Sequence, residues 1–218
     1  MPTQEVDPTS GLRRVTDAQT MRALSHPVRI ALIETLTLDG PLTATEASER
    51  IGESPTTCSF HLRQLARYGF VEEAGGGPGR NRPWKMSTVG ITSEASPSDH
   101  ETDTAQSVLL RMFRERYFRR LQTWEETRHS YPPEWQDASN ESEFLLWVTP
   151  EEAKAAEQEV FSTLMRFQDR IAHPELRPEG SAPVEALTFF YPFRPSELGA
   201  SSGTSRTRRR RKAQVRPD

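Results

Sequence analysis

The 218-residue sequence predicts a mainly α-helical protein with a small amount of β-structure. Apolar residues recur at helical spacing through most of residues 17–68 and 99–172. Two short extended pieces, 70–73 and 84–87, flank the glycine-rich run 75–79, which predicts a β-hairpin. Two further apolar runs, 144–148 and 184–191, stand on either side of a helical pattern. They predict a small C-terminal strand-helix-strand (βαβ) unit with parallel strands.

The composition indicates a cytoplasmic protein. No run of 18 apolar residues could span a bilayer, and the first 14 residues lack the apolar segment of a signal peptide. The lone Cys58 excludes a disulfide framework and fits a reducing compartment. The net charge of −3 is unevenly distributed: residues 206–218 carry +6, residues 91–205 carry −9, and residues 17–90 are neutral. Binding to a polyanion would therefore need local basic patches.

Helix-capping signals divide the N-terminal part, after a disordered lead-in expected at residues 1–16. Ser25 and Pro27 open a helix as N-cap and first helical residue. Thr43 and Glu46 form the capping box of a short helix over 44–51. Ser54 then caps a helix over 55–68 after a glycine turn. Together with the hairpin, these helices predict a winged helix-turn-helix domain over residues 17–90.

Small polar and basic residues lie where such a domain would meet DNA. The major groove of double-stranded DNA admits one α-helix, and the second helix of the pair enters N-terminus first. Basic residues on the wing, at 72–87, suit the phosphate backbone or the minor groove. The candidate DNA-binding residues are Thr56, Thr57, Ser59, Phe60, His61, Arg63 and Arg67 on the helix, and Arg80, Arg82 and Lys85 on the wing.

Two of these residues have equally good alternative roles. His61 either contacts DNA or forms a hydrogen bond within the domain. Phe60 either packs on a thymine methyl group or sugar, or belongs in part to the core. The domain as a whole also has an alternative, because a winged helix can act as a protein–protein adaptor that does not bind DNA.

The segments LSHPVRIALIETL and LTATEASERIGESPTTCSFHLRQLARYGFVEE resemble the ArsR-like winged-helix regulators. The resemblance rests on L-x-H-P-x-R at residues 24–29, S-x-H-L at 59–62 and G-F-V at 69–71, and it covers about a third of the chain. It implies a homodimeric transcription regulator that places two recognition helices in successive major grooves. Such regulators mostly repress, and many release DNA when an effector binds.

Metal sensing and catalysis are not expected. The third-helix stretch TATEASERIG lacks the Cys or His ligands of the metal-responsive relatives. Asp99, His100 and Asp103 cluster at the start of the long helix, but no second His follows within two turns. Cys58 stands alone on a face expected to be buried. The five histidines are scattered and no catalytic motif is present, so neither an enzyme nor a cofactor is predicted.

Residues 99–195 are predicted to form a dimerisation or effector domain. It starts with a long helix, about 99–129, whose apolar stripe we expect to pair with a two-fold mate. Thr149 and Glu152 form the capping box of a later helix that runs to about residue 172. The aromatic residues of this half either line a pocket for a small-molecule effector or form a core. The stripe consists of Ala105, Val108, Leu109, Met112, Phe113, Tyr117, Leu121 and Trp124.

Residues 196–218 are predicted to be a disordered, Arg-rich tail. Its seven Lys and Arg residues either add affinity for DNA or remain solvated.

Overall fold

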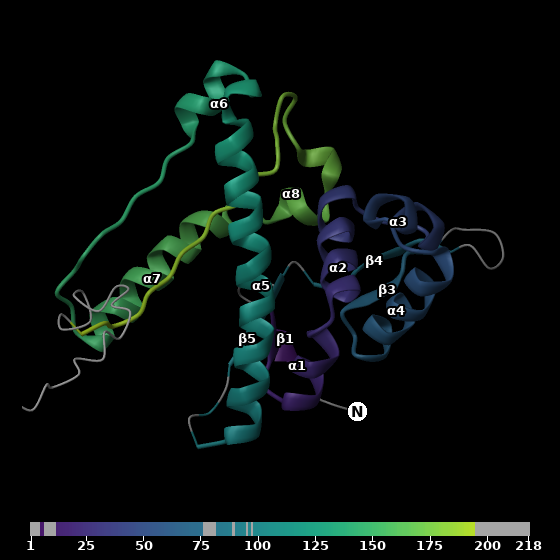
Figure 1. Ribbon diagram of the computed structural model, residues 1–218, viewed down its shortest axis with the longest axis horizontal. Helices are drawn as coiled ribbons and strands as arrows, with labels where there is room; N and C mark the ends of the chain where they lie inside the picture. The colour runs from purple at the N-terminus through teal and green to yellow at the C-terminus, as the bar shows by residue number, and fades with distance from the viewer. Residues whose placement is uncertain are drawn as a thin grey trace, which may run out of the picture. The chain divides into compact units, whose positions relative to one another are not determined.

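The computed structural model describes residues 5–6, 12–75, 82–88, 90–94, 96 and 98–194. The chain divides into two units, residues 1–183 and residues 184–218. Every helix and strand of the described residues belongs to the first unit (Figure 1). In the second unit, the described residues 184–194 have no regular secondary structure. The predicted Arg-rich tail lies outside the described residues.

The first part of the chain forms short helices and strands that lead into one long helix. In chain order these are β1 (Glu5–Val6), β2 (Leu12–Val15), α1 (Ala18–Leu24), α2 (Pro27–Asp39), α3 (Ala44–Ile51), α4 (Pro55–Arg67), β3 (Val71–Glu73), β4 (Trp84–Met86), β5 (Gly90–Ser93) and α5 (His100–Thr127).

The helix starts follow the capping signals in the sequence. α3 begins with the predicted capping box, in which the Thr43 hydroxyl accepts from the Glu46 backbone N–H and the Glu46 carboxylate accepts from the Thr43 N–H. α2 begins at Pro27 as predicted, but its N-cap is His26 rather than Ser25. Since Pro27 occupies the first helical position, the residue directly before it must be the cap.

The predicted hairpin is confirmed as the antiparallel pair β3–β4, in which Val71 lies opposite Met86. Leu42, in the connection between α2 and α3, pairs with Trp84 of β4 in an isolated antiparallel bridge. Its N–H donates to the Trp84 carbonyl oxygen at 3.0 Å, and the Trp84 N–H donates back at 2.7 Å. These two hydrogen bonds connect the wing to the helical part of the domain. Residues 76–81 at the hairpin tip lie outside the described residues.

The expectation of a disordered lead-in is wrong for the part that is described. β2 runs parallel to β5, with Leu12 opposite Gly90, and β1 pairs antiparallel with β2. The pairing joins two segments about 78 positions apart, a distance over which sequence patterns carry no register information. Arg13 is buried in β2, with its guanidinium 4.0 Å from the centre of the Phe70 ring.

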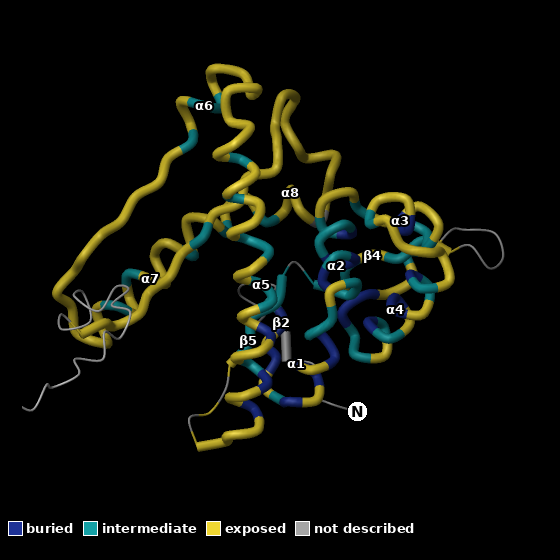
Figure 2. The backbone as a smooth tube through the Cα atoms, in the orientation of Figure 1, coloured by how far each residue is buried: buried dark blue, intermediate teal, exposed yellow. Residues whose placement is uncertain are grey.

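A single core spans the helix-turn-helix and the start of α5, as the dark tube in Figure 2 shows. The predicted boundary near residues 91–98 therefore does not separate two cores. Glu34 of α2 reinforces the junction by accepting hydrogen bonds from Arg116 and from Arg120, the latter at 2.9 Å. The apolar residues buried in this core are Val15, Ala18, Met21, Leu24, Leu32, Ile33, Leu36, Leu42, Ala47, Cys58, Leu62, Leu65, Phe70, Val71, Ala105 and Leu109.

The stripe on α5 therefore has a role that the sequence did not predict. Ala105 and Leu109 are buried in the core of their own chain, and Phe113 packs against it. α1 and α5 lie against each other over this stretch. Ala105 and Leu109 are thus covered within the chain and do not require a two-fold mate, whereas Val108 keeps 41% of its surface exposed.

The predicted βαβ unit is not formed. Residues 144–148 and 184–191 make no β-ladder within the described residues. A strand needs a neighbouring chain segment to receive its backbone hydrogen bonds, and a local apolar run cannot supply one. The helices of this region are η1 (Arg128–Ser130), α6 (Pro133–Ala138), α7 (Pro150–Met165), α8 (Asp169–Ala172) and η2 (Pro174–Leu176).

The start of α7 agrees with the sequence, and its end does not. The capping box of Thr149 and Glu152 is present, with Pro150 as the first helical residue. The helix ends at Met165, and a turn separates it from the short α8. After α8, Arg177 donates from Nη1 to the carbonyl oxygen of Leu38 at 3.0 Å, which links this region to α2.

Candidate nucleic-acid interface

The inner face of α4 fixes the orientation of the helix. Cys58, Leu62 and Leu65 are buried in the core at helical spacing. α3 packs beside α4, and the turn between them depends on Gly52, whose φ is +73°. Nothing lies near the position that a Cβ would take there, so the positive φ, and not space, favours glycine. The opposite face of α4 is held toward solvent.

The outer face of α4 carries four exposed residues on one stripe: Thr56, Phe60, Arg63 and Arg67. Phe60 keeps 51% of its surface exposed, which is unusual for an aromatic side chain on a short, well-packed helix. Within the part of the chain that the structure describes, neither Arg63 nor Arg67 forms an ion pair. The stripe therefore combines polar, aromatic and unneutralised cationic groups.

The N-terminal end of α4 is ordered by a cap. The Ser54 hydroxyl accepts from the backbone N–H of Thr57 at 3.0 Å and lies 2.8 Å from the Thr57 hydroxyl. Thr57 and Ser59 are half-buried, whereas Thr56 is exposed. Of the three small polar candidates, Thr56 is the most accessible, because the Thr57 hydroxyl already has a partner.

His61 points away from solvent. Its side chain is 8% exposed, and its ring lies 4.4 Å from the ring of His26, measured between centroids. The ring of Phe60 meets it edge-on at 5.1 Å. Burial lowers the pKa of His61, and the neighbouring His26 and Arg29 lower this pKa further. The ring is thus packed inside the domain, but its Nδ1 has no hydrogen-bond partner among the described residues, so the internal hydrogen bond considered from the sequence is not formed at this atom.

His26 was missed by the sequence analysis. Its Nδ1 accepts the Val28 N–H at 3.2 Å as the N-cap of α2. Burial lowers the pKa of His26, and the positive charge of Arg29 lowers it further. The sequence contained the signal, since His26 directly precedes a proline at a helix start. The ring contact with His61 could not be predicted from sequence, because it joins two helices.

The wing cations are paired with carboxylates. Arg82 donates to Glu73 at 2.7 Å, and Lys85 lies 3.1 Å from Glu72. The hydrogen bond and charge of Glu73 raise the pKa of Arg82. Glu72 lies directly opposite Lys85 in the hairpin, so the register of the predicted hairpin could have revealed this pair. Arg80, the third predicted wing contact, lies outside the described residues.

Other kinds of site find little support in the described residues. No three His, Cys, Asp or Glu side chains among them come together as metal ligands. None of the described helices is both long and apolar enough to cross a membrane. An open depression lies between the starts of α1 and α5, and its lining is mostly polar. It is lined by Thr16, Asp17, Ala18, Gln19, Arg22, Asp99, Glu101 and Thr102.

Comparison with known proteins agrees with the geometry. Residues 24–74 match the family model of the helix-turn-helix domain. The matched stretch begins at the end of α1 and ends just after β3, so it contains α4 and the helices that support it. A comparison with curated proteins finds none that matches the chain. The chain therefore contains a helix-turn-helix domain, to which the hairpin β3–β4 adds a wing.

Proposed function

We propose that this chain is a DNA-binding transcription regulator that reads the major groove of duplex DNA with α4. The observation that supports this most directly is the outer face of α4. It presents Arg63 and Arg67 without carboxylate partners among the described residues, beside an exposed Thr56. The inner face is locked into the core, so the helix is presented rigidly.

The arrangement suits entry of α4 into the groove by its N-terminus. Thr56 and Ser59 lie within the first turn and a half, where side chains of a recognition helix reach base edges. Phe60 is placed to pack on a thymine methyl group. Arg63 and Arg67 follow one and two turns later, at positions that suit phosphates on either side of the groove. His61, on the inner side of α4, packs against His26 and so helps to hold α4 in place.

The wing makes a weaker contribution in this proposal. Arg82 and Lys85 are neutralised by Glu73 and Glu72, so each must leave its carboxylate to bind a phosphate. The two released carboxylates would then repel the DNA backbone. We infer that specificity depends mainly on α4, and that the wing, with Arg80, adjusts affinity.

We further propose that the protein acts as a homodimeric repressor. Helix-turn-helix dimers bind two half-sites about 34–36 Å apart, and the two-fold symmetry of the protein matches that of the operator. A dimer on such a site covers DNA that RNA polymerase would use. An effector, if one acts on this protein, would have to change the spacing of the two α4 helices to release DNA.

The proposal is tested by selecting bound fragments from the DNA of the source organism and measuring affinity at several salt concentrations. Ser59→Ala should weaken specific binding by about 1–3 kcal/mol if it contacts a base. Arg63→Ala should weaken binding to all sequences and reduce the log–log salt slope by about one. Arg128→Ala, an exposed cation outside the helix-turn-helix, is the matched control and should bind like the parent.

Two results would contradict the proposal. If both α4 variants bind the selected fragments like the parent, α4 is not the reading helix. If no fragment is selected at any salt concentration, the domain does not bind DNA, and the protein–protein adaptor becomes the better explanation.

A further inference from the structure

The segment between α6 and α7, residues 140–149, is called the arm. It is exposed along its whole length, as the yellow tube between these two helices shows (Figure 2). Five consecutive apolar residues, 144–148, keep between 50% and 96% of their surface exposed, and Trp147 is the most exposed. None of residues 140–148 forms a hydrogen bond to another described residue. Before the cap residue Thr149, the arm therefore has no hydrogen-bond partner among the described residues.

The exposed apolar surface of the arm is large for a monomer. An aromatic side chain buries about 150–250 Å², so the five side chains together present on the order of 600 Å². The largest apolar patch of a typical monomer is about 300–600 Å² and usually has a function. One partner of a standard protein interface contributes about 800 Å². The arm alone thus supplies most of one side of such an interface.

The charge of the arm and its flanks is one-sided. Residues 130–153 contain six acidic residues and no Lys or Arg. Two of the acidic residues, Glu141 and Glu143, directly precede the apolar run. Neither forms an ion pair with another described residue. The surface that receives the arm should therefore present apolar side chains with basic side chains next to them.

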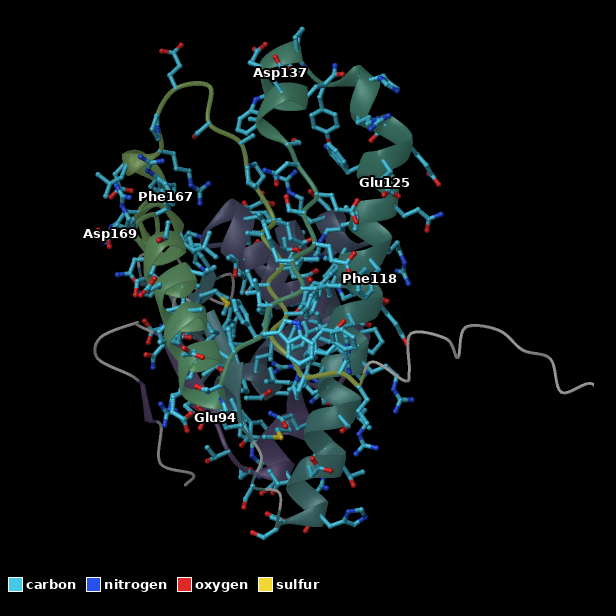
Figure 3. All side chains as sticks on the ribbon, turned by 90° about the vertical axis from the view of Figure 1, so that its left-hand side faces the viewer. Glu94, Phe118, Glu125, Asp137, Phe167 and Asp169 are labelled. Atoms are coloured by element: carbon cyan, nitrogen blue, oxygen red, sulfur yellow. The ribbon has the colours of Figure 1, made fainter. Side chains whose placement is uncertain are left out.

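The outward face of α5 presents both kinds of side chain, with Arg111 and Arg114 near its middle and apolar residues beside them. Residues 108–120 contain five Arg and one Glu. Arg111 and Arg114 lie on the side of α5 that faces away from the core, are exposed, and form no ion pair with any described residue. Val108 and Leu110 keep 41% and 39% of their surface exposed. Phe118, labelled in Figure 3, follows Arg111 by two helical turns, which places it on the same side of α5, and it is 51% exposed.

We propose that the arm docks on the outward face of α5 of a second copy of this chain, so that the two copies exchange arms. The arm does not cover α5 of its own chain, since both surfaces stay exposed. The exchange is reciprocal: each copy contributes one arm and one α5 face, which closes a two-fold dimer. Two arms bury on the order of 1,200 Å² of arm surface, within the range of stable interfaces once the α5 faces are added.

The first test is the oligomeric state of the full chain without DNA, by sedimentation equilibrium. The parent should be a dimer at micromolar concentration. The double variant Leu145→Glu, Trp147→Glu should raise the dimer dissociation constant at least 100-fold, because it places charges in the apolar contact. Leu38→Glu, at another exposed leucine (50%) near the end of α2, is the control and should remain dimeric.

The second test places complementary charges on different chains. A chain with Glu141→Lys and Glu143→Lys and a chain with Arg111→Glu and Arg114→Glu should each dimerise at least tenfold more weakly than the parent. Mixed together, they should form a heterodimer, since both arm–α5 contacts then pair opposite charges. Circular dichroism of each variant checks that the helices are retained.

Several results would overturn the proposal. A monomeric parent, or arm variants that dimerise like the parent, would exclude a role for the arm. Rescue in one chain that carries all four charge changes, without rescue in the mixture, would show that the arm covers α5 of its own chain. None of these measurements involves DNA. The proposal of arm exchange can therefore be disproved while the proposed DNA binding holds, and DNA binding can be disproved while arm exchange holds.

Discussion

At the scale of single residues, the contact between His26 and His61 joins the start of α2 to the recognition helix. The His61 Nδ1 and the Arg29 Nε are buried without a hydrogen-bond partner among the described residues. Arg29 and the two histidines place three basic groups together, and Glu53 is the acidic group that acts on both rings. The cluster is therefore favourable only while the imidazoles are neutral.

This arrangement predicts a loss of stability in mild acid. The pKa values of both histidines are lowered in the folded state, so the unfolded chain binds protons more readily. The stability that depends on the neutral rings is present above the ordinary histidine pKa of about 6.5 and decreases as the pH falls below it. Urea unfolding at pH 7.5 and 5.5 should show a lower free energy of unfolding at pH 5.5.

His61→Gln is the variant that isolates this effect. Glutamine does not titrate, so the difference in stability between pH 7.5 and 5.5 should become smaller than in the parent. His100→Gln, at an exposed position at the start of α5, serves as the control and should leave the difference unchanged. An equal difference in parent and His61→Gln would mean that other groups cause the acid sensitivity.

The prediction of side-chain roles from sequence succeeded where a local rule applied. Thr43, Ser54 and Thr149 cap their helices as predicted, because capping involves only the next three residues. The buried face of α4 follows from helical periodicity in the same way. The burial of His61 against His26 could not be predicted, because it depends on how α2 and α4 cross.

At the scale of elements, the wing shows how the two strands of a hairpin can neutralise each other. The carboxylate of Glu73 holds Arg82, and that of Glu72 holds Lys85, so the described part of the wing has little positive potential. In the proposed complex, DNA phosphates compete with these carboxylates for the same cations. The affinity of the wing for DNA is thus limited by its own acidic residues.

Glu73→Gln should therefore strengthen DNA binding. The substitution frees Arg82 and removes a charge that repels phosphate, so affinity for any duplex should rise at low salt. The log–log salt slope should become steeper by up to about one unit. Glu94→Gln is the matched control, because Glu94 pairs with Arg14 and lies outside the wing. A slope that stays at the parent value would show that Arg82 does not reach the DNA backbone.

The strands were the elements hardest to predict. The hairpin β3–β4 follows from two extended runs around glycines, and it is confirmed. β2 and β5 were missed because each is four residues long and finds its partner far along the chain. Residues 144–148 have the composition of a buried strand, but no described segment of the chain pairs with them. An apolar run predicts that a segment is buried. It does not show whether the segment is buried by its own chain or by another one.

At the scale of the whole molecule, charge separates the parts of the chain. Residues 91–205 carry a net charge of −9, which opposes contact between this region and DNA. Residues 206–218 carry +6 and lie outside the described residues. The helix-turn-helix region, residues 17–90, is neutral. In the proposed regulator, α4 thus supplies specificity for the DNA sequence, while the rest of residues 17–205 contributes little sequence-independent attraction to DNA. The basic tail is a source of such attraction.

Deletion of residues 205–218 should reduce general affinity without changing sequence preference. Each Lys or Arg that engages a phosphate releases counterions and adds about one unit to the log–log salt slope. The tail offers seven such residues, so its removal should reduce the slope by a few units. The dimer and the choice of operator should be unaffected, because neither α4 nor the arm is changed. Specific and non-specific affinities of both forms, measured at several salt concentrations, test this.

A control separates the charge of the tail from its presence. A chain in which the six Arg of the tail and Lys212 are replaced by Ser keeps its length and should behave like the deletion. If the deletion lowers the slope and the serine-substituted chain does not, the effect comes from chain length and not from phosphate contacts. If the slope is the same for the parent and the deletion, the tail does not engage DNA, and the helix-turn-helix must provide all of the binding by itself.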